Sequence, residues 1–261
     1  MWMRISALVL RYLYLYRRSL ARAGEVFFWP VMDLLVWGFL SEYLRDNKVD
    51  QVVLWLLGGL IFWDILYRSQ QAITLSLHEE MWARNVLNVF ISPLSMFEYL
   101  LATSLMGVIK AMLTLGVLGS LAFFLYTFNI LRIGFALLPF VASLLLFGWA
   151  VGMCTMAIIL RYGQAAEALV WGVPFLIQPI SAVFYPVAAL PRWLQYVAYS
   201  LPSTHVFEGM RTVLETGKLD PSSLVAAFAL NVVYLIGGAT FFGWMFRIVR
   251  EKGYLSRLGM E

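Results

Sequence analysis

Long apolar windows without charged side chains constrain this chain more than any other feature. Four stretches contain no Asp, Glu, Lys or Arg: 111–131, 133–160, 168–191 and 221–246. A helix needs about 20 apolar residues to cross about 30 Å of hydrocarbon, so each stretch is long enough. Two further windows, 26–41 and 52–67, are apolar except for one carboxylate each, Asp33 and Asp64. The pattern predicts an all-α integral membrane protein.

We predict one transmembrane domain, 1–261, with six spans. Their approximate bounds are 26–44, 52–75, 95–126, 133–160, 166–188 and 222–248. A β-barrel is excluded because its strands alternate strictly, whereas the run Ser-Leu-Leu-Leu-Phe at 143–147 does not. Only 13% of the residues are charged, against about 25% in soluble domains. This composition excludes a soluble enzyme, a disordered tail and a nucleic-acid binder.

The basic residues indicate which side of the membrane each terminus occupies. The basic residues that flank the first and last spans are Arg4, Arg11, Arg17, Arg18 and Arg22 at the start, and Arg247, Arg250, Lys252 and Arg257 at the end. With six spans, twelve of the 19 basic residues fall on the side of both termini and six, Lys48 among them, on the other. Cytoplasmic loops carry the excess of Lys and Arg. Both termini are therefore predicted to be cytoplasmic, in a bacterial inner (plasma) membrane.

Residues 1–22 are predicted to form an amphipathic helix in the cytoplasmic interface. Arg4, Arg11, Arg18 and Arg22 fall on one side of a helix, where they would face lipid phosphates, while aromatic and aliphatic residues occupy the rest. The arginines interrupt the apolar run that a cleavable signal peptide requires. The alternative is a basic flank that only sets topology.

The cytoplasmic connection between the second and third spans is predicted to hold an amphipathic helix over 79–91, which Pro93 ends. An amphipathic helix across the ends of the spans offers a docking surface for a soluble partner. The candidate docking residues are Glu79, Glu80, Met81, Trp82, Arg84, Asn85 and Asn88. The alternative is a plain surface connector.

The segment before the last span is predicted to form an outer, partly re-entrant helical hairpin over 190–216. Pro174, Pro179 and Pro186 break or kink the fifth span, and Gly217 is a plausible helix stop. Backbone that is not helical at membrane depth must be buried in protein or line a cavity.

These two connections resemble those of type-2 ABC exporter permeases. The cytoplasmic one carries Ile91-Ser92-Pro93-Leu94-Ser95 after the predicted helix. The outer one carries Pro186, Pro191, Trp193, Pro202, Thr204, Glu208 and Arg211. The resemblance implies a six-span permease that pairs with a second copy of itself or a homologous permease. It also implies a soluble ABC ATPase partner that binds ATP and Mg, with no cofactor in this chain.

No catalytic or metal site is expected in the chain itself. The only Gly-Lys step, Gly217-Lys218, lacks the first glycine of a phosphate loop, and the sequence His78-Glu79-Glu80-Met81-Trp82 lacks the second zinc ligand of H-E-x-x-H. Ser203 and Thr204 beside His205 do not make a nucleophile–base pair. The single cysteine, Cys154, excludes a disulfide.

Three charges inside the spans are candidates for a transport path. A charge at mid-bilayer costs about 2.5–3.5 kcal/mol on insertion scales. Asp64 can pair with Arg68 four residues on, whereas Lys110 needs a carboxylate from another span, with Asp33 and Asp64 as candidates. The alternative is a static ion pair between packed helices. Gly148-x-x-x-Gly152 is interpreted as a packing site within the chain rather than a dimer face.

The leading hypothesis is the permease of an ATP-driven exporter for amphipathic or hydrophobic, drug-like or lipid-like cargo. Aromatic residues make up 16% of the chain, which favours such cargo but also suits a polysaccharide or glycoconjugate path. Two further classes of protein fit the same pattern, an ion-coupled secondary carrier and a membrane scaffold that does not transport.

Overall fold

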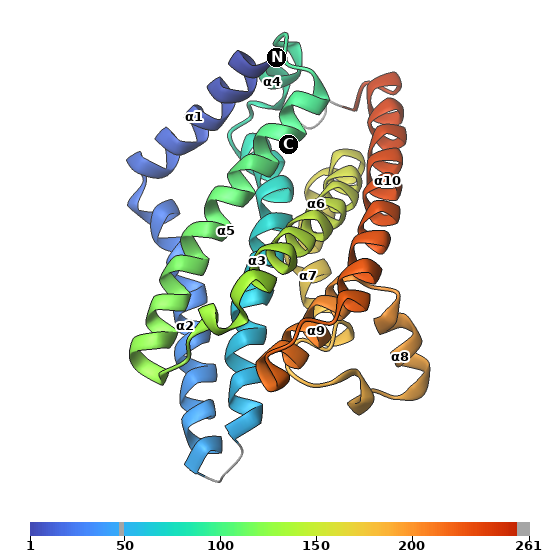
Figure 1. The fold of residues 1–261 in the computed structure, drawn as a ribbon. Helices are drawn as coiled ribbons and strands as arrows, with labels where there is room; N and C mark the ends of the chain where they lie inside the picture. The colour runs from blue at the N-terminus through green and yellow to red at the C-terminus, as the bar shows by residue number, and fades with distance from the viewer. Residues whose placement is uncertain (47–49, 255–261) are drawn as a thin grey trace.

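The computed structural model describes residues 1–46 and 50–254, and all regular elements in these ranges are helices (Figure 1). Lys48 and Arg257, used in the charge count, lie outside the described residues. The helices are α1 (Trp2–Arg18), α2 (Leu20–Asp46), α3 (Asp50–Trp82), α4 (Val86–Ile91), α5 (Met96–Tyr126), η1 (Ile130–Ala136), α6 (Leu137–Tyr162), η2 (Gly163–Ala166), α7 (Ala168–Ile180), η3 (Val187–Ala189), α8 (Arg192–Tyr199), α9 (Pro202–Thr216) and α10 (Pro221–Glu251).

Within the described ranges, five helical segments are long and apolar enough to cross a membrane. They are Arg22–Arg45, Val52–Trp82, Met96–Tyr126, Ile130–Ala166 and Pro221–Glu251. Where a sixth span over 166–188 is predicted, α7 has 13 residues and is therefore about 20 Å long. Pro174 and Pro179 lie inside α7, which ends at Ile180. The count of six full-length spans is therefore not confirmed.

The central helix of the bundle is α3. In its most apolar window 78% of the residues are buried, against 17–22% in α2, α5 and α10. Helices α2, α5, α6, α7 and α9 all pack against α3, and α6 packs against α10 on its other side. The apolar core between these helices includes Leu57, Ile61, Phe62, Ile65 and Phe140, all fully buried.

The glycine pair on α6 lets α6 approach α3 closely. A Cβ at Gly148 would lie 2.6 Å from the Ser69 Cβ and 2.8 Å from the Leu66 carbonyl oxygen. A Cβ at Gly152 would lie 3.0 Å from the Gln70 carbonyl oxygen. Because these neighbours include backbone atoms that cannot move aside, glycine is required there. The interpretation of the pair as a packing site within the chain is confirmed.

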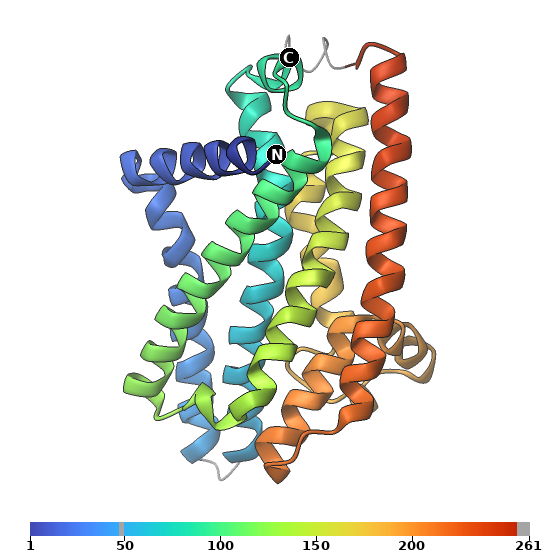
Figure 2. The same ribbon diagram turned by 45° about the horizontal axis from the view of Figure 1, so that its top comes forward.

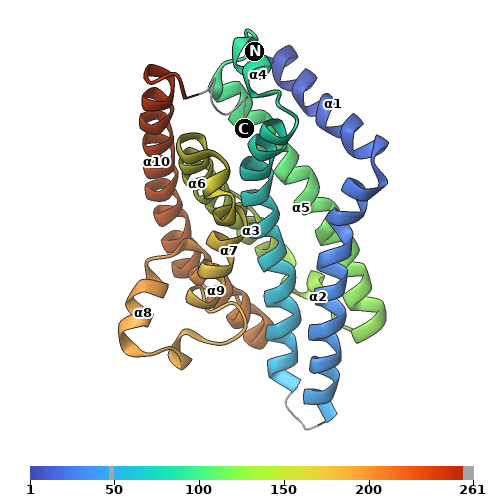
Figure 3. The same ribbon diagram turned by 180° about the vertical axis from the view of Figure 1, so that it is seen from behind.

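The two ends of the bundle differ in what they carry (Figures 1 and 3). We call the end with α1, α4 and the end of α10 the connector end, and the opposite end, with η1, α8 and α9, the hairpin end. Figure 2 shows α1 lying across the long helices rather than alongside them. Ile5, Leu8 and Tyr12 of α1 are buried against the bundle, whereas Trp2, Met3 and Tyr14 are exposed.

The prediction of one helix over 79–91 is wrong, because α3 continues to Trp82 and α4 begins only at Val86. Between them Arg84 has φ 51°, in the left-handed region. The Arg84 N–H donates to the Met81 carbonyl oxygen (2.9 Å) and the Asn85 N–H to that of Glu80 (2.8 Å). This is a Schellman helix stop, which normally has glycine at the left-handed position. An arginine at that position carries no such signal in the sequence.

Candidate coupling site and transport cavity

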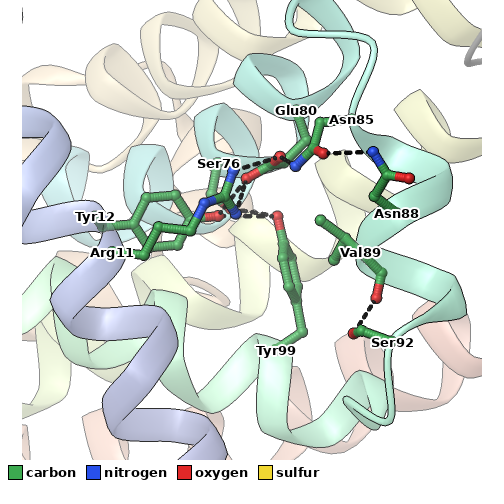
Figure 4. A network of polar contacts seen from close by, with 9 residues as sticks. All are labelled: Arg11, Tyr12, Ser76, Glu80, Asn85, Asn88, Val89, Ser92 and Tyr99. Atoms are coloured by element: carbon green, nitrogen blue, oxygen red, sulfur yellow. Dashed lines mark hydrogen bonds and ion pairs between the residues drawn. The ribbon is translucent and has the colours of Figure 1, made fainter.

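A buried carboxylate, Glu80, forms the centre of the connector end (Figure 4). It lies in the last turn of α3 and is 3% exposed. Arg11 of α1 holds both of its oxygens, with Nη1 2.6 Å from Oε1 and Nη2 2.9 Å from Oε2. Asn85, after α3, donates from Nδ2 to Oε2 at 2.5 Å. Glu80 therefore connects α1 to the α3–α4 connection.

Further hydrogen bonds extend this network to α4 and α5. The Tyr12 hydroxyl lies 3.4 Å from Glu80 Oε1 and 3.5 Å from the Tyr99 hydroxyl, which donates to Ser76 Oγ at 3.2 Å. Asn88 of α4 donates to Asn85 Oδ1 at 3.0 Å. Burial raises the pKa of Tyr12 well above its usual value, and the hydrogen bond that Arg11 donates to Glu80 raises the pKa of Arg11. Tyr12 is then a neutral hydrogen-bonding group and Arg11 a cation. A single polar network thus joins four helices.

A second contact fixes the start of α1 against α5. Arg4 Nη2 lies 3.2 Å from Glu98 Oε1, and Arg4 also donates to the Pro93 carbonyl oxygen. Glu98 forms a capping box with Ser95: the Ser95 N–H donates to Glu98 Oε2 (2.8 Å), and the Glu98 N–H donates to Ser95 Oγ (3.3 Å). This box starts α5 immediately after the connection.

The prediction that the α1 arginines face lipid headgroups is wrong for Arg4 and Arg11. They lie seven residues apart, on the face that also buries Ile5 and Leu8, and each binds a carboxylate of the bundle. Arg17 and Arg18, at the end of α1, are exposed, and the Arg4 side chain is exposed as well despite its ion pair. Arg22 lies on α2, and the predicted stripe is divided between two helices.

The predicted docking residues fall into an inner and an outer set. Glu80 and Met81 are buried, and Glu79 lines a small cavity beside Tyr16 and Lys110. Asn85 is half-buried against Glu80. The exposed members are Trp82, Arg84 and Asn88, beside Ile91, which is 80% exposed. We call Trp82, Arg84, Asn88 and Ile91 the connector patch. Ile91 was not among the predicted docking residues, because an apolar residue in an amphipathic helix is ordinarily assigned to the core.

The three in-membrane charges do not form one cluster. Asp64 and Arg68 pair at 3.3 Å, which confirms the i,i+4 prediction. Lys110 Nζ instead donates to the Tyr16 hydroxyl at 2.5 Å and lies 4.4 Å from the centre of that ring. Among the described residues it forms no ion pair, so the prediction that it pairs with Asp33 or Asp64 is wrong. The reason is that the end of α1 packs against α5 and covers the lysine.

A cavity of about 580 Å³ lies along α3 between α2 and α7, with a contribution from Leu118 of α5. Figure 3 shows α2 on one side of α3 and α7 on the other. Its aromatic lining residues are Trp29, Trp37, Trp63, Tyr67, Trp171 and Phe175. Its charged lining residues are Glu25, Asp33, Asp64 and Arg68. Ligand pockets typically enclose about 300–1,000 Å³, so its size suits a drug-like molecule.

At the hairpin end, Arg211 of α9 closes the turn that follows α7. It is 3% exposed, and Nη2 donates to the Ala182 carbonyl oxygen and to Glu208 Oε1, both at 2.9 Å. Glu208 Oε1 also accepts from the Val187 N–H at 2.8 Å. Ala182 has φ 52°, a left-handed conformation that costs a non-glycine residue about 1 kcal/mol or more. Arg211 and Glu208 hold this turn in place.

The other predicted hairpin residues begin helices or face outward. Pro186 and Pro191 precede η3 and α8, and Pro202 is the first residue of α9. Thr204 is fully buried, Trp193 is 69% exposed, and Gly217 ends α9 at φ 69°, as the sequence predicts. α9 packs against α3, α6 and α10, so it belongs to the bundle.

Sequence reasoning missed the polar interior of α3. Beyond the pair at Asp64 and Arg68, the buried polar residues of this helix are Ser69, Gln70, Gln71, Thr74, Ser76, His78 and Glu80. The signal was available, since polar residues are dense over 68–80. The sequence predicts a span over 52–75 but not the burial of these polar side chains, because apolar periodicity cannot show what covers a polar face.

The five long apolar helices and the helix lying across their ends define a multi-pass membrane protein. The family model of the ABC-2 type transporter matches residues 6–214, which is most of the chain. The chain therefore belongs to the ABC-2 type transporter family, whose members are transport permeases rather than catalytic proteins. A comparison with curated proteins found no match.

Proposed function

We propose that this chain is the membrane subunit of an ATP-driven exporter. It pairs with a second copy or a homologous permease, and a separate ABC ATPase binds ATP and Mg and hydrolyses the nucleotide. Membership of the ABC-2 type transporter family supports this assignment. The observation that carries it is the Glu80 network, because this network links the exposed connector patch to α1, α3 and α5.

The network suggests how force from the ATPase reaches the spans. The partner binds the connector patch on α4 and the α3–α4 connection. Because Asn88 and Asn85 are bonded to each other and Asn85 to Glu80, a displacement of α4 moves the end of α3. Arg11 passes the movement to α1, which also bonds to Lys110 of α5 through Tyr16. The helices around the cavity then shift relative to one another.

The cargo is amphipathic or hydrophobic and moves through the cavity beside α2, α3 and α7, at the interface of two permeases. The aromatic lining and the size of the cavity support a drug-like or lipid-like molecule. Aromatic faces also stack on sugar rings, and Gln178 in the lining could hydrogen-bond them, so a polysaccharide or glycoconjugate is the second candidate.

The chain has both termini on the cytoplasmic face of a bacterial inner membrane. Six passes result if α7 and the segment up to α8 together reach the outer face, with the helical hairpin over 190–216 partly re-entrant. The excess of Lys and Arg on the terminal side supports this topology. The Arg211 contacts support it as well, since they satisfy the carbonyl oxygens of the turn after α7 within the protein.

Two exposed tryptophans at opposite ends test the assignment. Trp82 belongs to the connector patch, whereas Trp193 lies on α8. In proteoliposomes that contain the permease and its ATPase, Trp82→Ala should lower vanadate-sensitive, ATP-dependent export and co-purification of the ATPase. Trp193→Ala should leave ATPase binding unchanged. ATPase binding that persists in Trp82→Ala, Arg84→Ala and Asn88→Ala combined would overturn the docking assignment.

A further inference from the structure

The cavity beside α3 combines aromatic surface with negative charge. Trp29 is 62% exposed, Trp171 is half-buried, and both line the cavity. The other two indole rings in the lining are covered, since Trp37 stacks on Phe184 at 4.4 Å and Trp63 is buried. The negative face of an indole ring attracts a cation placed over it within about 6 Å. Trp29 and Trp171 are therefore the indole rings available to a bound molecule.

The charges in the cavity wall do not balance. Asp33, Asp64 and Arg68 all line the cavity, and they comprise two carboxylates and one guanidinium. Arg68 pairs with Asp64 (3.3 Å), while Asp33 forms no ion pair among the described residues. Glu25 adds a third carboxylate, but it also lines an adjoining cavity of about 40 Å³ together with Arg22 and Lys110. The imbalance is clearest at Asp33 and Asp64.

One carboxylate oxygen in the wall is buried without a partner. Asp64 is 7% exposed, and its Oδ2 accepts no hydrogen bond from the described residues, whereas Oδ1 faces Arg68. A buried oxygen of an ionised carboxylate is ordinarily satisfied, because leaving it unpaired loses the hydration it had in water. An unsatisfied carboxylate oxygen in the wall of an aromatic cavity can accept a hydrogen bond from a bound molecule or lie beside its positive group.

We propose that the cargo of this permease is a cationic amphiphile, whose positive group lies between Asp33 and Asp64 and whose apolar body lies against Trp29 and Trp171. This inference rests on the proposed function for the direction of transport but not for the binding itself. A neutral sugar would leave the carboxylates without a counter-charge. An anionic amphiphile would be repelled by them, since Arg68 is already paired.

Two probes of equal shape and opposite charge test the site. Tetraphenylphosphonium and tetraphenylborate each carry four phenyl rings. Their equilibrium binding is measured on the purified permease in lipid nanodiscs, with binding to empty nanodiscs subtracted. Saturable binding is expected for tetraphenylphosphonium, and no saturable binding for tetraphenylborate. Saturable binding of both probes with similar Kd, or competition by a neutral oligosaccharide in place of the cation, would overturn the proposal.

The variant Asp33→Asn tests the charge with little risk to the fold, because Asp33 is exposed on α2. It should weaken tetraphenylphosphonium binding about tenfold, the effect of one lost charge contact. Glu42→Gln is the matched control, since it removes a carboxylate from the same helix outside the cavity. Asp64→Asn should weaken binding further, and the unfolding temperature shows whether it folds. Unchanged Kd in Asp33→Asn contradicts the proposal.

The site and the transport function can fail separately. The cation could bind saturably and yet not be exported in vesicles that contain the ATPase and ATP. This result would support the cation site and contradict the proposed function. Vanadate-sensitive export of a neutral or anionic cargo, with no saturable tetraphenylphosphonium binding, would remove the cation site and leave the exporter.

Discussion

The connector end and the hairpin end both bury charged residues, and the buried charges of Glu80 and Arg211 are neutralised differently. At the hairpin end, Arg211 is met by Glu208 three residues earlier on the same helix and by two carbonyl oxygens of the turn after α7. At the connector end, the buried group is Glu80, and its cation comes from Arg11, 69 residues away on α1. The side chain of Arg11 is 38% exposed, whereas that of Arg211 is 3% exposed.

The difference indicates which end is fixed and which can move. Arg211 holds a left-handed Ala182 in a closed turn, and its partners are local or backbone groups, so the contact cannot change without opening the fold. Glu80 is shared among separate helices, and its arginine is reachable from water, so the helices can shift while the carboxylate stays neutralised. A rigid hairpin end and an adjustable connector end suit a permease driven from one side.

The largest expected effect is at Arg211. Removing one partner of a buried charge network costs about 3–5 kcal/mol, because the remaining polar groups lose their partner. Arg211→Ala should therefore lower the yield of folded protein and its unfolding temperature in detergent. Arg192→Ala, at an exposed position on α8, is the control and should unfold like the parent. If Arg211→Ala unfolds at the same temperature as the parent protein, Arg211 does not hold the hairpin end rigid.

The next effect is at Glu80 and should appear in transport more than in stability. Glu80→Gln keeps the shape of the side chain but removes the charge that Arg11 binds, which loosens α1 from the end of α3. We expect reduced ATP-driven export with the ATPase still bound. Glu215→Gln, exposed near the end of α9, is the control.

The double variant Arg11→Met with Glu80→Gln shows whether the two residues act as a unit. If they do, the double variant should export no less than whichever of the two single variants exports less. Additive losses would show that the pair is not the link between α1 and α3.

A smaller effect is expected at Lys110, the third contact between α1 and the bundle. Lys110→Met removes the hydrogen bond to Tyr16 and the cation over its ring, so it should reduce transport or assembly. Tyr16→Phe keeps the aromatic ring beneath the lysine cation and should therefore reduce transport or assembly less than Lys110→Met does. Unchanged expression and unchanged export in Lys110→Met would exclude a role for this contact.

The smallest effect is expected at the start of α5. Ser95→Ala removes the capping box with Glu98 and should cost about 1 kcal/mol of stability, as helix caps do. Ser120→Ala, in the same helix with a hydroxyl bonded only to the Gly116 carbonyl oxygen, is the control. Equal unfolding temperatures for these two variants would show that the cap does not matter at the connector end.

Features that depend on neighbouring residues could be predicted from the sequence. Five of the six long apolar windows correspond to long helices among the described residues, Asp64 pairs with Arg68 one turn away, and Gly217 ends α9. In each case the determinant is length, a four-residue spacing or a glycine, which a single sequence displays.

Features that depend on distant elements could not be predicted. Arg84 ends α3 in a left-handed conformation without the glycine that signals it, and Lys110 binds Tyr16 because α1 folds back onto α5. The cavity is likewise assembled from α2, α3 and α7, so Trp29 and Trp171 meet only in the folded chain. Tertiary packing determines the end of α3, the Lys110 contact and the cavity, and local sequence patterns do not predict tertiary packing.

The most direct test of the account is cargo movement in proteoliposomes with and without the ATPase. The permease and ATPase together should drive vanadate-sensitive accumulation of cargo against its gradient when ATP is supplied. The permease alone should show no uphill movement under any ion gradient. Accumulation by the permease alone, driven by a proton or sodium gradient, would contradict the claim that this chain takes its energy from a separate ATPase at the connector end.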